Sequence, residues 1–247
     1  MVEPAFPLRD AASVLLVRGE PLEVMMVRRT ARASFASSYV FPGGVVEAGD
    51  GDEDWLPHLI GAEGLSAVER AARIAGCRET FEETAILLAT APGSAARERT
   101  PCPTTLPFLQ LLIDRGLQLD LTRLVPFAHW LTPPGMPRRF DTRFYIAIAP
   151  ADQAGSSDGT EITDIMWDRP AVCIDEALSG SRNLFFPTLA NLERLSETET
   201  VGAALRRASE RPLSIVSPTI KEQNGEKIIV LPDGSDYRRL TFPFQEQ

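Results

Sequence analysis

The feature that most constrains this chain is a run of three glutamates at helical spacing. In the segment RETFEE at 78–83 the carboxylates stand at positions i, i+3 and i+4, so on a helix that advances about 100° per residue they share one face. Ile74, Cys77, Phe81 and Ala85 lie on the opposing stripe, which predicts packing against a sheet. Clustered like charges repel one another, and a hard cation such as Mg²⁺ would turn that repulsion into ligation.

A solvated acidic face is the simplest alternative, because such faces are common on helices. Two neighbouring features favour a site instead. Arg78 precedes the cluster and is able to orient one carboxylate through a bidentate hydrogen bond. Upstream, a strand-like segment runs into the sequence FPGG at 41–44, where glycine lets the backbone approach a ligand closely.

The segments around this cluster predict a layered fold of strands and helices. Ser66 and Glu69 have the form of a capping box, in which both side chains satisfy exposed helical N–H groups. The tail after 210 contains two strand-like pieces, 213–217 and 226–231, and residues 48–65 are predicted to be a loop. Strand-like segments cover 10–18, 21–28, 123–131, 140–149 and 161–168, and helical segments cover 66–88, 104–116, 171–179 and 187–210. This interleaving indicates an α+β or α/β layered fold.

Composition restricts the partners. The chain has 247 residues, of which 44% are hydrophobic, and a formal net charge of −9, so its surface repels nucleic acid polymers and anionic membranes. A small anionic substrate remains compatible where a metal or an arginine cluster neutralises it. Three widely separated cysteines, with no apparent signal peptide, favour a reducing, cytoplasmic setting.

The pattern Gly44-(five residues)-Asp50, followed by RETFEE at 78–83 and the apolar Ile86, resembles the signature of the Nudix hydrolases. Aspartate at position 50, where the family usually has glutamate, keeps the charge. Ala85 replaces the usual glycine, and because alanine is a good helix former, we expect the helix to continue beyond it. Between Asp50 and Arg78 lie the 27 residues 51–77, a longer stretch than the family pattern has.

The resemblance implies the domain organisation and the fold. We expect an α+β Nudix fold, an α/β/α sandwich with a mixed β-sheet flanked by helices, in a single domain over 1–247. Its core covers about 9–180, an insertion covers about 51–70, and a C-terminal helical and β extension covers about 181–247. The extension either covers the core or builds a homodimer interface, and the sequence does not separate these alternatives.

The resemblance also implies a metal site and its catalytic residues. One or more Mg²⁺ or Mn²⁺ ions are expected on Glu79, Glu82 and Glu83, with the carbonyl of Gly43 completing the shell and Arg78 as part of the catalytic set. Glu161 follows the flexible sequence GSSDGT at 155–160 and is the candidate general base. Asp158 and Asp164 are its rivals.

Arginines before the glycine turn and around the strand FDTRF at 140–144 are candidates for binding phosphate, because guanidinium groups bind it bidentately. They are Arg28, Arg29, Arg32, Arg138, Arg139 and Arg143. Of these we select Arg29 and Arg143, together with Gly44, as substrate-binding residues. A solvated surface position is the alternative for each arginine.

The inserted box, together with HWLTPPGMPRRFDTRFYIA at 129–147, is similar to the acyl-coenzyme A diphosphatase branch of the family. This similarity implies hydrolysis of the diphosphate bond of coenzyme A or acyl-CoA. A sanitising NTP or nucleotide-sugar pyrophosphatase is the alternative within the family, since one scaffold serves many substrates. An alternative of another class is a regulator that binds a nucleotide without cleaving it.

Overall fold

The computed structural model describes residues 7–30, 37–91 and 107–245. Arg32, Cys102 and the first residues of the helix predicted at 104–116 lie outside these ranges. Within them, no helix has the length and apolarity that a bilayer span requires.

A mixed sheet of eight strands forms the centre of the described chain, in the order β10-β2-β1-β9-β8-β11, with β3 paired to β2 and β4 paired to β1. Its strands are β1 (Leu8–Arg18), β2 (Glu23–Arg29), β3 (Tyr39–Val40), β4 (Gly43–Val45), β8 (Val125–Leu131), β9 (Arg139–Ile148), β10 (Ile162–Asp168) and β11 (Ile215–Val216). β1 pairs in parallel with β9 along almost its whole length and antiparallel with β2 and β4. The mixed α+β sheet predicted above is confirmed.

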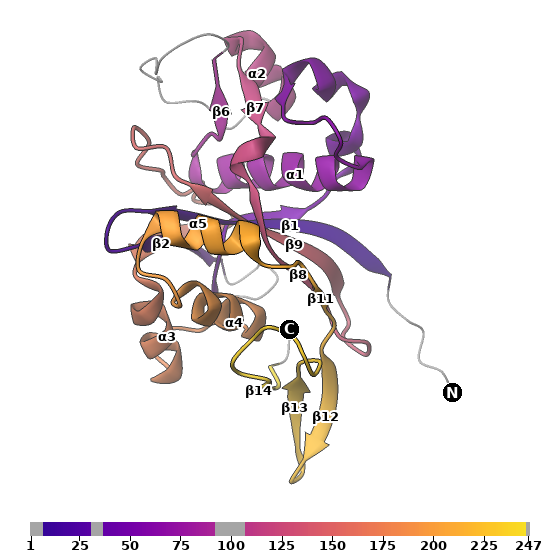
Figure 1. Cartoon of the computed structure of the whole chain (residues 1–247), viewed down its shortest axis with the longest axis vertical. Helices are drawn as coiled ribbons and strands as arrows, with labels where there is room; N and C mark the ends of the chain where they lie inside the picture. The colour runs from indigo at the N-terminus through magenta and orange to yellow at the C-terminus, as the bar shows by residue number, and fades with distance from the viewer. Residues whose placement is uncertain (1–6, 31–36, 92–106, 246–247) are drawn as a thin grey trace.

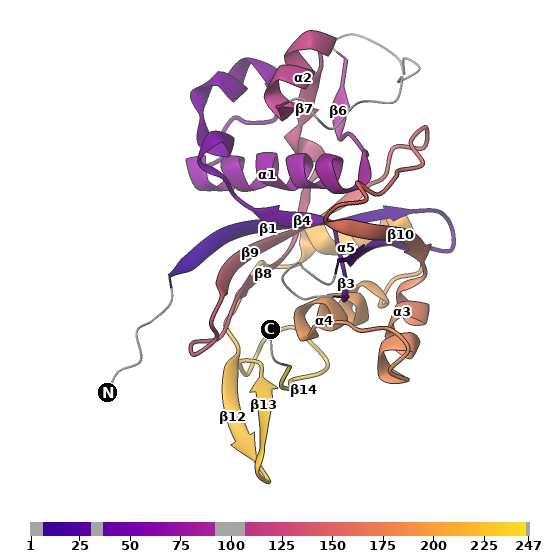
Figure 2. The same cartoon turned by 180° about the vertical axis from the view of Figure 1, so that it is seen from behind.

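Helices cover both faces of this sheet (Figures 1 and 2). One face carries α1 (Ala67–Thr84), α2 (Phe108–Arg115) and a small sheet of β5 (Leu59–Ile60), β6 (Ala89–Thr90) and β7 (Gln118–Asp120). The other carries α3 (Pro170–Leu178), α4 (Phe186–Leu195) and α5 (Val201–Glu210). A third sheet of β12 (Thr219–Gln223), β13 (Glu226–Val230) and β14 (Thr241–Pro243) projects from one end (Figure 1).

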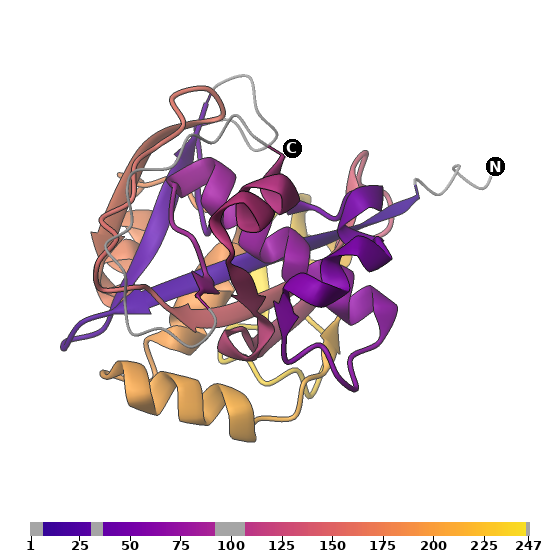
Figure 3. The ribbon, with the colours of Figure 1, turned by 90° about the horizontal axis from the view of Figure 1, so that it is seen from above.

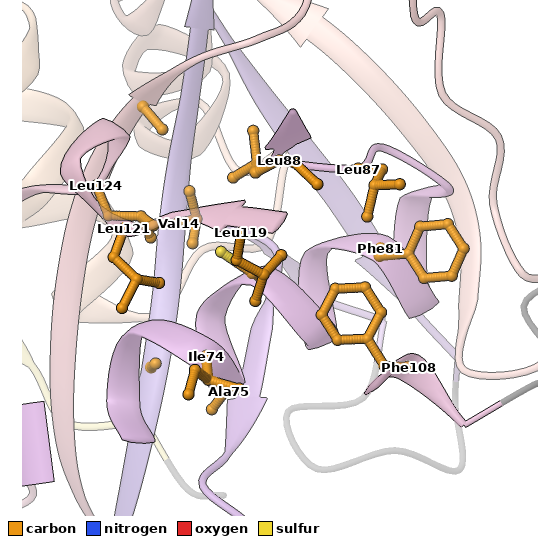
Figure 4. Packing of buried hydrophobic residues seen from close by; sticks show 14 of the residues in the cluster. Val14, Ile74, Ala75, Phe81, Leu87, Leu88, Phe108, Leu119, Leu121 and Leu124 are labelled. Atoms are coloured by element: carbon orange, nitrogen blue, oxygen red, sulfur yellow. The ribbon is translucent and has the colours of Figure 1, made fainter. Parts of the chain in front are cut away.

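Each face of the sheet has its own hydrophobic core, because successive strand residues point to opposite sides. Val14 and Tyr145 belong to the core beneath α1, whereas their neighbours Leu15 and Ile146 belong to the core beneath α4 and α5. The α1 core includes Phe81, stacked on Phe108 of α2 with ring centroids 5.5 Å apart (Figure 4). The two cores fix which side of the sheet each strand residue faces.

Helix α1 begins as predicted and ends earlier than predicted. The Ser66 hydroxyl accepts a hydrogen bond from the Glu69 amide, but the Glu69 carboxylate accepts from Arg73 and Tyr145 instead of completing a capping box. The expected continuation to Leu88 through Ala85 is wrong, since Ala85 is left-handed with a φ of 57° and the helix ends at Thr84. After this reversal Ile86 and Leu88 are fully buried, and the Leu87 amide and carbonyl form hydrogen bonds with the Gln153 side chain.

Other segments also differ from their predictions. The long helix expected over 187–210 is two helices, because the chain turns after Leu195 and Thr200 caps α5 by accepting from the Ala203 amide. The loop expected over 48–65 contains the 3₁₀ helices η1 (Ala48–Gly51) and η2 (Glu53–His58) and strand β5. Seen from above, this insertion lies beside α2 over α1 (Figure 3). In the tail, β12 is a strand that the sequence pattern missed.

The C-terminal extension lies against the core. Strand β11 adds to the edge of the main sheet beside β8, and residues of α4, α5 and β13 share the core beneath the sheet. Trp130 of β8 donates a hydrogen bond to the Tyr237 hydroxyl at 3.1 Å. These contacts agree with the alternative in which the extension covers the core.

Candidate active site

The glycine turn before β4 meets the acidic face of α1. The amide of Gly43 donates a hydrogen bond of 2.9 Å to Glu83 Oε2. Gly43 has a φ of 153°, and a Cβ there would overlap the backbone of Ala12 and Ser13. A Cβ on Gly44 would overlap the carboxylate of Glu79. Gly43 therefore requires glycine, a side chain at Gly44 would displace the Glu79 carboxylate, and two of the three predicted carboxylates face the turn.

Arg78 organises the acidic residues, as the sequence suggested for one of them. Its guanidinium binds Asp50 bidentately, with Nε and Nη2 each 3.0 Å from a carboxylate oxygen. Its Nη1 donates to Glu79 and Glu82 at 2.8 and 2.9 Å, and Nη2 also donates to the Val45 carbonyl. All five N–H groups of an arginine are thereby used. Asp50 is buried, so this ion pair ties the start of the insertion to α1.

The environment opposes ionisation of all three glutamates. Burial raises the pKa of Glu79 and of Glu82, and the Arg78 charge offsets part of that rise. Burial raises the pKa of Glu83 to about 8, against the Gly43 amide and the Arg29 charge, while the charges of Glu79 and Glu161 add to the rise. A nearby cation would favour the ionised forms.

The donor set fits a hard divalent cation, although the side chains are not gathered around one. Among the described residues, no three Asp, Glu, His or Cys side chains form a ready-made metal cluster; Glu79 and Glu82 are hydrogen-bonded to Arg78 instead. Glu83 Oε1 is buried and accepts no hydrogen bond from the described residues. A buried carboxylate oxygen that accepts no hydrogen bond, beside other carboxylates, matches the oxygen ligands of Mg²⁺ or Mn²⁺.

Arg29 connects this acidic site to the candidate general base. Its two terminal nitrogens lie 3.5 Å from Glu83 Oε1 and 3.7 Å from Glu161 Oε2. The Glu161 side chain is 67% exposed and accessible to water. Asp158 instead accepts from the amides of Glu161 and Ile162, which holds the loop, and Asp164 is exposed beside β2. Glu161 is thus the one of the three that pairs with Arg29.

Arg143 is placed on the α1 face of the sheet, among acidic side chains. It lies 3.1 Å from Asp10, 3.7 Å from Glu69 and 3.5 Å from Asp141, and Asp141 also pairs with His129. A cavity next to the glycine turn is described below, and Arg143 is not among the described residues that line it. The environment of Arg143 is an ion-pair network, and the phosphate-binding role expected from the sequence stays a prediction.

A cavity of about 510 Å³ lies on the opposite face of the sheet and reaches the glycine turn. It contains arginines at both ends and an aromatic lining between them. Gly43, Gly44 and Arg29 belong both to this lining and to the carboxylate site. The other lining residues that matter here are Arg9, Arg138, Arg139, Phe41, Trp130, Phe140, Phe144, Phe185 and Phe186. No aspartate or glutamate is found among the described residues of the lining.

No family model matches the chain. It is 31% identical to the acyl-coenzyme A diphosphatase NUDT19 of Gallus gallus, in an alignment that covers 83% of this chain and 72% of that protein. The chain is a Nudix hydrolase. Its identity with the human protein of the same name is 25%, over 76% of this chain and 68% of that one.

The fold of this Nudix hydrolase is also found in a solved structure. A NUDIX hydrolase from Alicyclobacillus acidocaldarius superposes with a TM-score of 0.72 at 26% identity, covering 83% of this chain and 99% of that one. Nudix hydrolases are diphosphatases that generally depend on divalent cations and act on small-molecule diphosphates. The acidic face of α1 is where the present chain carries residues suited to that chemistry.

In this Nudix hydrolase, three residues that line the cavity were not predicted from the sequence: Arg9, Phe185 and Phe186. Arg9 precedes the first apolar run, and Phe185 and Phe186 open a helix in the extension. The sequence FFPT at 185–188 carried one signal, since paired aromatics at a helix start are unusual on a solvated surface. Nothing in their spacing connects these residues to the glycine turn, because strand pairing and the packing of α4 bring them together.

Proposed function

We propose that this Nudix hydrolase cleaves the diphosphate bond of a nucleoside diphosphate derivative, with coenzyme A or an acyl-CoA as the favoured substrate. The observation that carries the proposal is the double position of Gly43 and Arg29, between the acidic face of α1 and the cavity. A diphosphate bound at this turn would extend one of its two substituents into the cavity. Similarity to proteins named acyl-coenzyme A diphosphatase supports the substrate class.

A Mg²⁺ or Mn²⁺ ion would be held by Glu79, Glu82 and Glu83 with the Gly43 carbonyl. When bound, it supplies charge neutralisation of the diphosphate and a more acidic water. Glu82 is 41% exposed at its side chain, so it is the ligand with most freedom to leave Arg78. Arg78 would then keep Asp50 and Glu79 in place.

The remaining steps belong to Arg29 and Glu161. The Arg29 guanidinium would bind a phosphate oxygen and hold it near the turn. Glu161, exposed and next to Arg29, would accept the proton of the attacking water. A carboxylate in this role must be ionised, so activity should fall on the acidic side of the pH profile.

The proposed function is tested with a panel of diphosphate compounds incubated with Mg²⁺ or Mn²⁺, with products resolved by mass. We expect coenzyme A to yield a phosphopantetheine fragment and adenosine 3′,5′-bisphosphate. Cleavage of NTPs or nucleotide sugars alone would contradict the coenzyme A assignment. Binding without cleavage of any compound would favour the regulator.

The role of Glu161 is tested by the pH–rate profile of Glu161→Gln. We expect the acidic limb of kcat/KM to disappear together with most of the activity. Asp164→Asn, which changes the exposed rival carboxylate three residues later on β10, is the matched control. An unchanged acidic limb in Glu161→Gln would remove this residue from the role of general base.

A further inference from the structure

We infer that the cavity recognises a second phosphate on the substrate, a phosphomonoester on the nucleoside, through Arg9 and Arg138 at the end remote from the glycine turn. The inference rests on the proposed function for one point only, the location of the scissile diphosphate at Gly43. It names a narrower substrate class: nucleoside diphosphate derivatives whose ribose carries an additional phosphate.

Strand register places the two arginines on the cavity face of the sheet. Arg9 pairs with Phe140 and Ser13 pairs with Phe144 in the parallel ladder of β1 and β9, and paired residues point to the same side. Arg138 lies just before Arg139, the first residue of β9. Arg9, Arg138, Phe140 and Phe144 all line the cavity, whereas Arg143, of opposite parity, faces α1.

The same register separates these arginines from the scissile position by a short, defined span. Ser13 is the β1 partner of Gly43, and Arg9 lies four residues before it. At about 3.3 Å per strand residue, the backbone separation is about 13 Å. An arginine side chain that leans back along the strand shortens that distance, so one nucleoside bridges the two ends.

The aromatic part of the lining suits a nucleobase. Phe41 and Phe144 meet edge to face with ring centroids 6.4 Å apart, and Trp130 meets Phe186 of α4 at 5.9 Å. All four rings line the cavity. Aromatic surfaces of this kind bind the flat faces of bases. A volume of about 510 Å³ falls within the range of nucleotide-sized pockets.

The positive charge of the cavity lining favours a phosphorylated ligand over an apolar one. The chain has a formal net charge of −9, yet the described lining contains four arginines and no acidic residue. Arg29 serves the diphosphate end, and Arg139 donates to the Thr132 carbonyl. An acyl chain or a neutral pantetheine arm would gain nothing from Arg9 and Arg138, whereas a phosphomonoester forms charge-assisted hydrogen bonds with both.

The first experiment compares kcat/KM for coenzyme A and 3′-dephospho-coenzyme A, which differ by this phosphate alone. We expect the wild-type protein to prefer coenzyme A at low salt, with a preference that shrinks as ionic strength rises. In Arg9→Gln and in Arg138→Gln the preference should fall by about ten-fold. Arg206→Gln, which removes an exposed charge on α5 outside the cavity, should keep it. Equal efficiency of the wild-type protein on both substrates would overturn the inference while leaving the proposed function intact.

The second experiment measures binding and does not depend on turnover. Titration calorimetry with adenosine 3′,5′-bisphosphate and with AMP should give at least about ten-fold tighter binding of the bisphosphate to the wild-type protein. That advantage should be lost in the Arg9→Gln/Arg138→Gln double variant. If coenzyme A is not cleaved, the proposed substrate fails, and this titration still decides the inference. Equal affinity for the two nucleotides would overturn it.

Discussion

The two faces of the central sheet carry different halves of the site. On one face, α1 contributes three glutamates within five residues of the chain: Arg78 binds Glu79 and Glu82, and the Gly43 amide binds Glu83. On the other, a basic and aromatic cavity draws its residues from β1, β8, β9 and α4, which span most of the sequence. In the proposed function, the metal ligands on α1 are thus local in sequence, whereas the residues proposed to select the substrate are not. Among the described residues, Gly43, Gly44, Val45 and Arg29 belong to both.

The largest effect is expected from a substitution that changes only the acidic half of the site. In Glu83→Gln, a carboxylate oxygen that is buried and without a hydrogen bond is replaced by a neutral group of nearly the same size. We expect kcat to fall by at least about a hundred-fold with either cation, while binding of adenosine 3′,5′-bisphosphate persists. Glu210→Gln, at an exposed position on α5, is the control. Full turnover by a folded Glu83→Gln protein would contradict the assignment of the acidic face.

Glu83 should also make the stability of the metal-free protein depend on pH. Since burial raises its pKa to about 8 in the folded state, above the value of about 4.3 in an unfolded chain, folding takes up a proton between these values. Stability should therefore be greatest below the lower value and should decline as pH rises to about 8. Chelated wild-type protein should lose on the order of 5 °C in Tm across that window. Glu83→Gln should flatten the profile, and added Mg²⁺ should restore stability at the alkaline end. A profile identical in the two proteins would refute the link.

A smaller effect on activity is expected where Arg78 joins the acidic half to the insertion. Arg78→Lys keeps the charge and loses the bidentate hold on Asp50. We expect activity to fall about 10- to 100-fold and unfolding to cost about 3 kcal/mol less, because Asp50 is left buried and poorly paired. Adding Asp50→Asn should recover part of the stability and none of the activity. Chemical denaturation of the single and double variants measures the changes in unfolding free energy, and hydrolysis assays measure the changes in activity.

The sequence could predict the acidic half because its geometry follows from helical periodicity alone. The positions of Glu79, Glu82 and Glu83 on one face need no tertiary information, and neither does the glycine turn before them. The predicted end of α1 was wrong because helix propensity favoured continuing through Ala85, whereas the chain reverses there and Leu87 forms hydrogen bonds with the Gln153 side chain. Tertiary packing overrode the local preference.

The other half could not be predicted, because strand alternation gives two faces without saying which one holds the substrate. Arg143 lies on β9 and Arg138 lies just before it, and alternation alone does not say which of them faces the cavity, since Arg139 has the parity of Arg143 and still lines the cavity. The sequence favoured Arg143, and the structure places it against Asp10 and Glu69 of the α1 face. The wall built by Phe186 depends on where α4 packs, which follows from the break between α4 and α5 that periodicity had joined into one helix.

The smallest effect is expected from a substitution that changes only the cavity half of the site. Phe186 lines the cavity on one side and contacts Phe242 of β14 on the other, with ring centroids 6.0 Å apart. Phe186→Ala should raise KM for coenzyme A by about ten-fold or less through lost apolar contact, with kcat nearly unchanged because no carboxylate moves. Phe242→Ala removes the support without altering the lining itself, so it should lower Tm at least as much, since Phe242 is the more buried ring, and raise KM less. If both variants changed KM and Tm in the same proportion, the aromatic wall would act only through stability, and the division between a catalytic face and a recognition face would have to be abandoned.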